Sequence, residues 1–61
     1  MKIMIYDPED NLQRDKFVRG NSYLFLGEIE NMPGHCVVVL NGKIVYGYHS
    51  ECFREPKQDE L

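Results

Sequence analysis

The chain has 61 residues, which is enough for one small domain and leaves no room for a second. Its net charge is −3 and it carries seven basic residues, which disfavours nucleic-acid binding because that depends on clustered positive charge. No apolar run is long enough to span a membrane or to act as a signal peptide, so we expect a cytoplasmic protein with reduced cysteines.

The first strand is predicted at residues 2–6, KIMIY, because β-branched and aromatic residues dominate there. An Asp-Pro pair then opens a polar segment, residues 7–16. Asp-Pro favours a turn, and the segment is too polar to be buried. We therefore expect a long loop in which Leu12 is the one apolar anchor.

A second strand is predicted after the turn at Gly20-Asn21, where the run SYLFL begins. Gly27 interrupts this run and Ile29 resumes it. A glycine inside a strand pattern indicates a bulge or a sharp bend. The next turn is predicted at Pro33-Gly34, an order that suits a type II turn.

The clearest local signal is Asn41-Gly42, which separates HCVVVL from KIVYGY and predicts a type I′ hairpin. A two-residue loop fixes the cross-strand pairs. The expected pairs are Leu40 with Lys43, Val39 with Ile44, Val38 with Val45, Val37 with Tyr46, Cys36 with Gly47, and His35 with Tyr48.

Both faces of this hairpin are apolar, so periodicity leaves two alternatives open. One face carries Val37, Val39, Ile44, Tyr46 and Tyr48, and the other carries Cys36, Val38, Leu40, Val45 and Gly47. If the face of Val38 and Val45 is the core, Tyr46 and Tyr48 lie outside with Val37, Val39 and Ile44, and such an exposed apolar surface on a soluble protein marks an interface. In the alternative, these residues form the core. Tyrosine suits an interface because its ring buries area while its hydroxyl stays hydrated.

After Tyr48, the segment HSECFRE predicts one turn of 3-10 helix that presents Phe53 and stops at Pro56. The whole pattern predicts an all-β protein, a small five-stranded barrel, because a short sheet with two apolar faces can curl and close on itself. We expect a single domain over residues 1–55, followed by a flexible polar tail at residues 56–61.

The segments RGNSYLFLGEI and CVVVLNGKIVYGYHSECF resemble the SH3-like small barrels of bacterial and phage accessory proteins. The resemblance covers residues 18–54 and rests on Gly20, Tyr23, the Asn41-Gly42 tip, Tyr48 and Phe53. It implies an SH3-like barrel with a short 3-10 turn near the C-terminus. Because these shared positions belong to the core and the turns, it implies no functional residue.

The two histidines and two cysteines raise the possibility of a metal site. His35, His49 and Cys52 form a conceivable three-ligand set, but their spacing matches no standard zinc pair, and we expect no metal and no other cofactor. A disulfide between Cys36 and Cys52 is an alternative that a reducing cytoplasm disfavours. A Cys–His nucleophile needs an orienting group and a pocket that so small a barrel seldom has, so we expect no enzymatic activity.

The sequence therefore predicts a non-catalytic binding protein of phage or bacterial origin that acts through protein–protein contacts. The expected contact residues are Tyr46, Tyr48 and His49, with Tyr6 as an outside possibility. A homodimer is a natural consequence, because it hides an apolar surface and stabilises a small domain. Two alternatives are a metal-stabilised protein using His35, His49 and Cys52, and a nucleic-acid-binding barrel using Arg14, Lys16 and Arg19.

Overall fold

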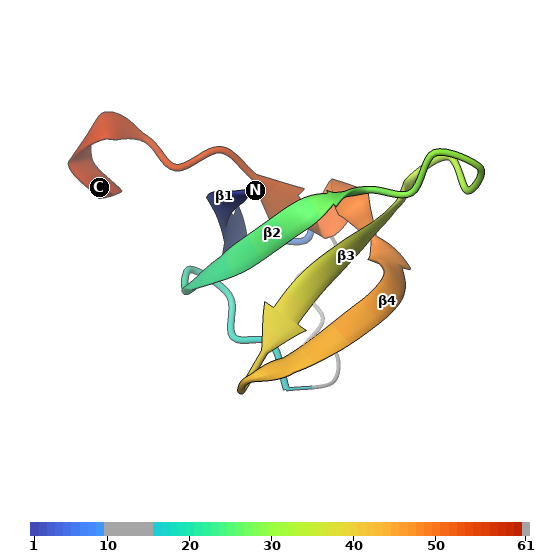
Figure 1. The fold of residues 1–61 in the computed structure, drawn as a ribbon. Coiled ribbons are helices and arrows are strands. Elements are labelled where there is room, and N and C mark those ends of the chain that lie inside the picture. Colours follow the sequence, from blue (N-terminus) through green and yellow to red (C-terminus); the bar gives the residue numbers. More distant parts are fainter. Residues whose placement is uncertain (10–15, 61) are drawn as a thin grey trace.

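A computed structural model of the chain describes residues 1–9 and 16–60. It contains one antiparallel sheet of five strands in the order β4-β3-β2-β1-β5, curled into a half-barrel (Figure 1). The strands are β1 (Lys2–Tyr6), β2 (Ser22–Glu28), β3 (His35–Leu40), β4 (Lys43–His49) and β5 (Phe53–Arg54). The all-β prediction is confirmed, and the described residues contain no α-helix. The sheet stays open between β4 and β5, where the sequence predicted closure.

Two short 3-10 turns complete the described part of the chain. The first, η1 (Ser50–Cys52), lies in the segment predicted to form a 3-10 turn, but it ends at Cys52, and β5 occupies Phe53–Arg54, where the turn was expected to continue toward Pro56. The second, η2 (Gln58–Glu60), lies in the C-terminal tail. The guanidinium of Arg54 donates two hydrogen bonds of 2.8 Å to the Glu60 carboxylate, which ties η2 to β5. Flexibility of the tail stays a prediction. Most of the predicted loop, including Leu12 and Arg14, lies outside the described residues.

The β3–β4 hairpin forms at the predicted tip. Asn41 and Gly42 have φ values of 53° and 78°, the left-handed pair that a type I′ turn requires. The pairing follows the prediction from Leu40 opposite Lys43 as far as Val37 opposite Tyr46.

Beyond Val37 the predicted pairing is wrong. Cys36 lies opposite Tyr48 instead of Gly47, and His35 lies opposite His49 instead of Tyr48. Gly47, with a φ of 88°, is the extra residue of a β-bulge. Glycine adopts this left-handed conformation without the steric cost that a Cβ brings. The bulge breaks the alternation of the strand and turns Tyr48 to the same face as Cys36.

A second bulge lies on the other side of β3, at Gly27, where the sequence predicted a bulge or a bend. Phe25 is opposite Val38 and Gly27 is opposite Val37, so β2 has one extra residue at this level. The two bulges therefore flank the same part of β3. Because each bulge increases the local right-handed twist, the two together account for the strong bend of the sheet here.

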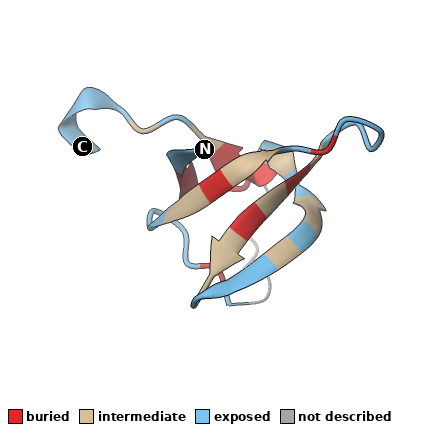
Figure 2. Ribbon diagram, in the orientation of Figure 1, coloured by how far each residue is buried: buried red, intermediate tan, exposed pale blue. Residues whose placement is uncertain are grey.

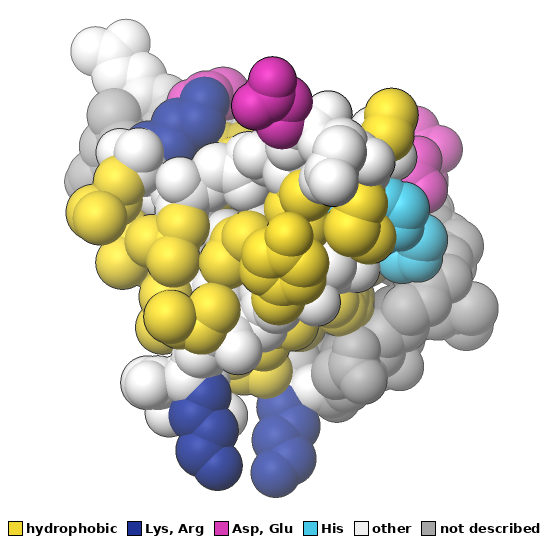
Figure 3. Space-filling model, turned by 45° about the vertical axis from the view of Figure 1, so that its right-hand side comes forward, with side chains coloured by type: hydrophobic (Ala, Val, Ile, Leu, Met, Phe, Trp, Pro, Cys, Tyr) yellow, Lys and Arg dark blue, Asp and Glu magenta, His cyan; other side chains and the backbone are white. Residues whose placement is uncertain are grey.

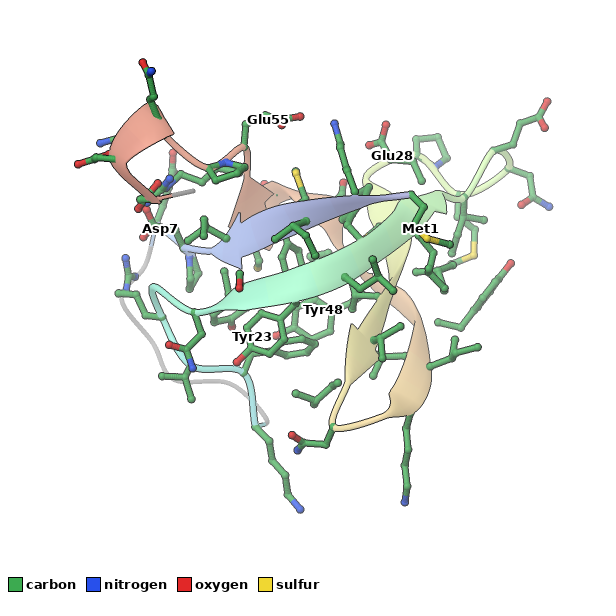
Figure 4. The ribbon with its side chains drawn as sticks, turned by 60° about the vertical axis from the view of Figure 1, so that its left-hand side comes forward. Met1, Asp7, Tyr23, Glu28, Tyr48 and Glu55 are labelled. Atoms are coloured by element: carbon green, nitrogen blue, oxygen red, sulfur yellow. The ribbon has the colours of Figure 1, made fainter. Side chains whose placement is uncertain are left out.

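The inner, concave face of the sheet holds the core, and it is the face of Val38 and Val45 (Figure 2). Six of the seven aromatic residues form one inner aromatic cluster: Tyr6, Phe17, Tyr23, Phe25, Tyr48 and Phe53. Phe17 is fully buried, and its ring centroid lies 5.1 Å from that of Tyr6, 4.9 Å from Tyr23 and 4.7 Å from Tyr48. Tyr23 and Tyr48 both point to this side of the sheet (Figure 4).

Candidate interaction surface

The outer face of the sheet carries a row of aliphatic side chains that crosses four strands. Ile3 on β1 is opposite Leu24 on β2, and Val39 on β3 is opposite Ile44 on β4. Because Phe25 pairs with Val38, the preceding residue, Leu24, lies beside Val39, so the row is continuous from β2 to β3. Beside this row lies the pair Val37–Tyr46. We call these residues the outer patch: Ile3, Leu24, Val37, Val39, Ile44 and Tyr46.

The outer patch is open to solvent, most of all on β4. Ile44 and Tyr46 are each 68% exposed and Ile3 is 48% exposed, while the remaining members are half-buried. Hydrophobic side chains spread over this face of the molecule (Figure 3). Isolated exposed apolar residues are ordinary on a soluble protein, but a contiguous group is not, and it is typical of a binding surface.

Of the predicted contact residues, the structure brings Tyr46 to the outer patch and separates Tyr48 from it. The prediction that Tyr48 shares a face with Tyr46 is wrong, because the Gly47 bulge turns Tyr48 into the inner aromatic cluster. Its hydroxyl lies 3.1 Å from the hydroxyl of Tyr6. Tyr6, the outside possibility, is fully buried and is therefore no surface contact. His49 is exposed at the end of β4, away from the tip.

Charged residues lie at opposite ends of the strands that carry the patch. Lys43 directly follows the hairpin tip. Lys16 also lies near the tip, because it lines the same hollow as Leu40 and Val45, which are close to the tip. Glu28 ends β2 at the far end of the sheet, and Glu30 and Glu51 follow β2 and β4 there. Lys2 lies at this acidic end as well, but it forms an ion pair with Glu55. In Figure 3, lysine or arginine side chains project below the hydrophobic surface, and acidic side chains lie above it beside further basic ones.

The histidines form a cross-strand pair at the end of the hairpin. Their ring centroids lie 5.1 Å apart, and His35 Nδ1 is 3.0 Å from the carbonyl oxygen of Pro33. Cys52, the third residue of the candidate metal set, lies in the core, and only 4% of its surface is exposed. Over residues 1–9 and 16–60, no group of three His, Cys, Asp or Glu side chains is arranged to hold a metal ion.

Both cysteines, which lie in the described chain, are buried thiols rather than a disulfide. Cys36 has no exposed surface, and this burial raises the pKa of its thiol to about 11, with further increases from the negative charge of Glu28 and from Cys52. A thiol with so high a pKa is protonated at neutral pH and is a poor nucleophile. Cys36 therefore packs as a small apolar residue.

Among the hollows formed by residues that the structure describes are one of about 310 Å³ and one of about 380 Å³ on the surface of the half-barrel. Met4, Phe25 and Phe53 line the first together with Lys2, Glu28, Ser50 and Glu51, and Phe17, Leu40 and Val45 line the second together with Lys16. Neither hollow is lined by a cysteine or a histidine, so neither presents a Cys–His pair to a substrate.

The basic residues considered for nucleic-acid binding do not gather on one face within the described chain. Lys16 is exposed near the hairpin tip. The guanidinium of Arg19 is engaged by the carboxylate of Asp7 and the carbonyl oxygen of Pro8. Arg14 lies outside the described residues. The positive charges of Arg19 and Arg54 lower the pKa of Asp7, the largest contribution being the hydrogen bond from Arg54.

The sequence analysis placed Val37, Val39 and Ile44 on the same face as Tyr46, which the strand pairing confirms, but it did not include Ile3 and Leu24 in this surface. The signal for Leu24 was available in the run Tyr23-Leu24-Phe25, where aliphatic and aromatic residues alternate. The aromatic residues of that run face the inner cluster, so Leu24 faces outward.

Two further findings bear on the kind of protein this is. In the part of the chain that the structure describes, no helix has the length and apolar character needed to cross a bilayer. Comparison of the chain with protein-family models, with curated proteins and with solved structures gives no significant match.

Proposed function

We propose that this chain is a non-catalytic binding protein that acts through protein–protein contacts on its outer patch. The observation that carries the proposal is the position of Tyr46. It is the one aromatic residue outside the inner aromatic cluster, and it is 68% exposed beside the equally exposed Ile44. Exposed aromatic and aliphatic side chains on one sheet face are typical of protein interfaces, where tyrosine is enriched.

We further propose that the fold is SH3-like and that the protein is an accessory protein of a phage or bacterium. The strand order β4-β3-β2-β1-β5 supports the first of these, together with a tight β3–β4 hairpin and the 3-10 turn η1 between β4 and β5. These elements agree with the residues that carry the sequence resemblance, Gly20, Tyr23, Asn41-Gly42, Tyr48 and Phe53. Fold alone does not define function, so the binding role depends on the outer patch.

Affinity capture from a bacterial lysate tests the binding role. The bait is the full chain, compared with Tyr46→Ala and with Val18→Ala as a matched control, because Val18 is 48% exposed but lies in the segment before β2. We expect Tyr46→Ala to lose captured protein and Val18→Ala to retain it. Tyr48→Ala is unsuitable because it removes a ring from the core. Identical capture by all three chains would argue against the outer patch.

A further inference from the structure

We infer that the hollow of about 310 Å³ between β1, β2 and η1 receives an arginine side chain of a partner protein. We call it the acidic hollow. Its lining has an apolar floor of Met4, Phe25 and Phe53 and a polar rim of Lys2, Glu28, Ser50 and Glu51. This site goes beyond the proposed function, because it lies on the inner side of the sheet and the outer patch lies on the opposite side.

The bulge at Gly27 turns Glu28 toward the acidic hollow. Phe25 faces the inner side, so strict alternation would point Gly27 inward and Glu28 outward. The bulge shifts the pairing, and Glu28 lies opposite Cys36, a residue of the core. Directly opposed residues share a face, so Glu28 ends β2 on the inner side. Burial is the main reason that the pKa of the Cys36 thiol is raised, and the charge of Glu28 adds to it, which agrees with this position.

Two other segments complete the acidic hollow. Lys2 and Met4 are two residues apart on β1, and both line the hollow from that strand. On the opposite side, η1 contributes Glu51, and Phe53 follows at the start of β5. The ring centroids of Phe53 and Phe25 lie 6.1 Å apart, and both rings are buried. Since the lining comes from segments far apart in the sequence, the hollow exists only in the folded chain.

The charge that the acidic hollow offers to a ligand is negative. The ammonium group of Lys2 donates a hydrogen bond to the carboxylate of Glu55, which follows β5 and balances its charge. Glu28 and Glu55 lie on the same side of the ribbon (Figure 4). Within residues 1–9 and 16–60, neither Glu28 nor Glu51 has an ion-pair partner. Two carboxylates at the rim of an apolar floor favour a ligand that is both cationic and apolar.

An arginine side chain combines these two properties. Its aliphatic stem packs on apolar surface, while its guanidinium donates hydrogen bonds to carboxylates and stacks on aromatic rings. The volume of about 310 Å³ is at the lower end of the range of roughly 300–1,000 Å³ for small-molecule pockets, so one side chain suits it better than a large ligand. Arginine is also enriched at protein interfaces, and the net charge of −3 favours a basic partner.

A titration of the isotope-labelled full chain with acetyl-Gly-Arg-Gly-amide, followed by NMR at constant ionic strength, tests the inference. A single anchored side chain binds weakly, with an expected Kd of roughly 1–10 mM, which a titration to about 50 mM covers. The largest shifts should occur at the amides of Glu28, Ser50, Glu51 and Phe53. The neutral peptide acetyl-Gly-citrulline-Gly-amide has nearly the same shape and should bind about threefold more weakly or worse.

Charge-neutral variants test the two carboxylates. Glu28→Gln and Glu51→Gln should each weaken binding of the arginine peptide roughly twofold to fivefold. Glu30→Gln is the matched control, because Glu30 is exposed in the turn after β2 and does not belong to the lining. It removes the same charge and should leave the Kd nearly unchanged. The amide spectrum of each variant establishes that it is folded.

Absence of saturable shifts around the hollow at about 50 mM peptide would overturn the inference. Equal binding of the citrulline peptide, or wild-type binding by both Glu28→Gln and Glu51→Gln, would overturn it as well. Tyr46→Ala should bind the peptide as the wild type does, since Tyr46 lies on the outer patch. Failure of the peptide to bind, combined with loss of captured protein by Tyr46→Ala, would leave the proposed function standing. Peptide binding combined with unchanged capture would remove the outer patch and support the acidic hollow.

Discussion

Tyr46 and Tyr48 lie two residues apart on the same strand and have opposite environments. Tyr46 is 68% exposed on the outer patch, whereas Tyr48 packs in the inner aromatic cluster with its hydroxyl 3.1 Å from that of Tyr6. Strict alternation would put both on one face. The difference teaches that both faces of this sheet are apolar enough to be a core, and that one bulged glycine decides which tyrosine becomes structural.

The largest expected effect is at the centre of the inner aromatic cluster. Phe17→Ala removes a fully buried ring that contacts several others, and such substitutions cost about 3–5 kcal/mol. A chain of this length has a total stability of roughly 3–9 kcal/mol, so we expect most or all of the cooperative unfolding transition to disappear. Urea unfolding followed by circular dichroism measures this. The adjacent Val18→Ala, at an exposed position, should change stability by less than about 0.5 kcal/mol, and a comparable loss there would contradict the assignment of the core.

Replacing each of the two tyrosines with alanine tests whether Tyr48 is part of the core and Tyr46 is not. We expect Tyr48→Ala to cost about 2–4 kcal/mol, below the value for a fully buried ring because Tyr48 is half-buried. Tyr46→Ala should stay within about 0.5 kcal/mol, as is usual at exposed positions. Chemical denaturation at low protein concentration, where self-association does not contribute, measures both. Equal losses would mean that the bulge does not separate the two rings.

Gly47→Ala tests the bulge directly. An added Cβ would meet only Met32 Cε, at 3.9 Å, so the expected cost of about 1–2 kcal/mol is conformational, arising from a φ of 88°. Gly47→Asn should lose less, since asparagine tolerates the left-handed region better than alanine. The same denaturation experiment measures both variants. If alanine were tolerated as well as glycine, the strand would not need its left-handed residue.

The smallest effect is expected from the charged cluster on the surface, where Arg54 bonds to Asp7 and Glu60. Hydrogen bonds from Arg54 and from the Lys57 backbone lower the pKa of Glu60 from 4.5 to about 2. A carboxyl group with a lowered pKa stabilises the fold above about pH 4.5, and this contribution is lost as the pH falls toward about 2. Arg54→Gln should therefore lower the melting temperature slightly at pH 7, as expected for an exposed ion pair, and by less as the pH falls toward about 2, which flattens the dependence of melting temperature on pH in this window.

A control for this prediction is Lys57→Gln, which leaves Arg54 and its carboxylate partners in place. Its melting temperature should depend on pH nearly as that of the wild type does. An unchanged acid profile for Arg54→Gln would show that these ion pairs are broken in solution.

The sequence predicted the elements of the fold better than their faces. Asn41-Gly42 specified the hairpin tip and its first four pairs because only a few turn types accept two left-handed residues. The bulge at Gly27 was recognisable because the glycine interrupts a clear strand. At Gly47 the same residue type was read as an ordinary strand position, and the error moved Tyr48 and His35 to the wrong partners.

The candidate site was predictable only in part for a related reason. Local periodicity identifies two apolar faces but not which of them meets the rest of the chain. The choice depends on long-range packing: Phe17 and Phe53, from outside the hairpin, contact Tyr48 and fill the concave side. Tyr46 followed from the hairpin pattern, whereas Ile3 and Leu24 joined the patch only through the alignment of β1 with β2.

The Arg54 side chain connects segments from both ends of the molecule. It lies on β5, which has only two residues, and it contacts Asp7 directly after β1 and Glu60 near the C-terminus. Removal of Glu60 by a carboxypeptidase would break its bonds to Arg54 and leave β5 held to β1 by two residue pairs and by the contact between Arg54 and Asp7. Amide exchange would then accelerate first at Phe53 and Arg54, which makes this margin of the sheet the place where proteolytic nicking begins to open the half-barrel.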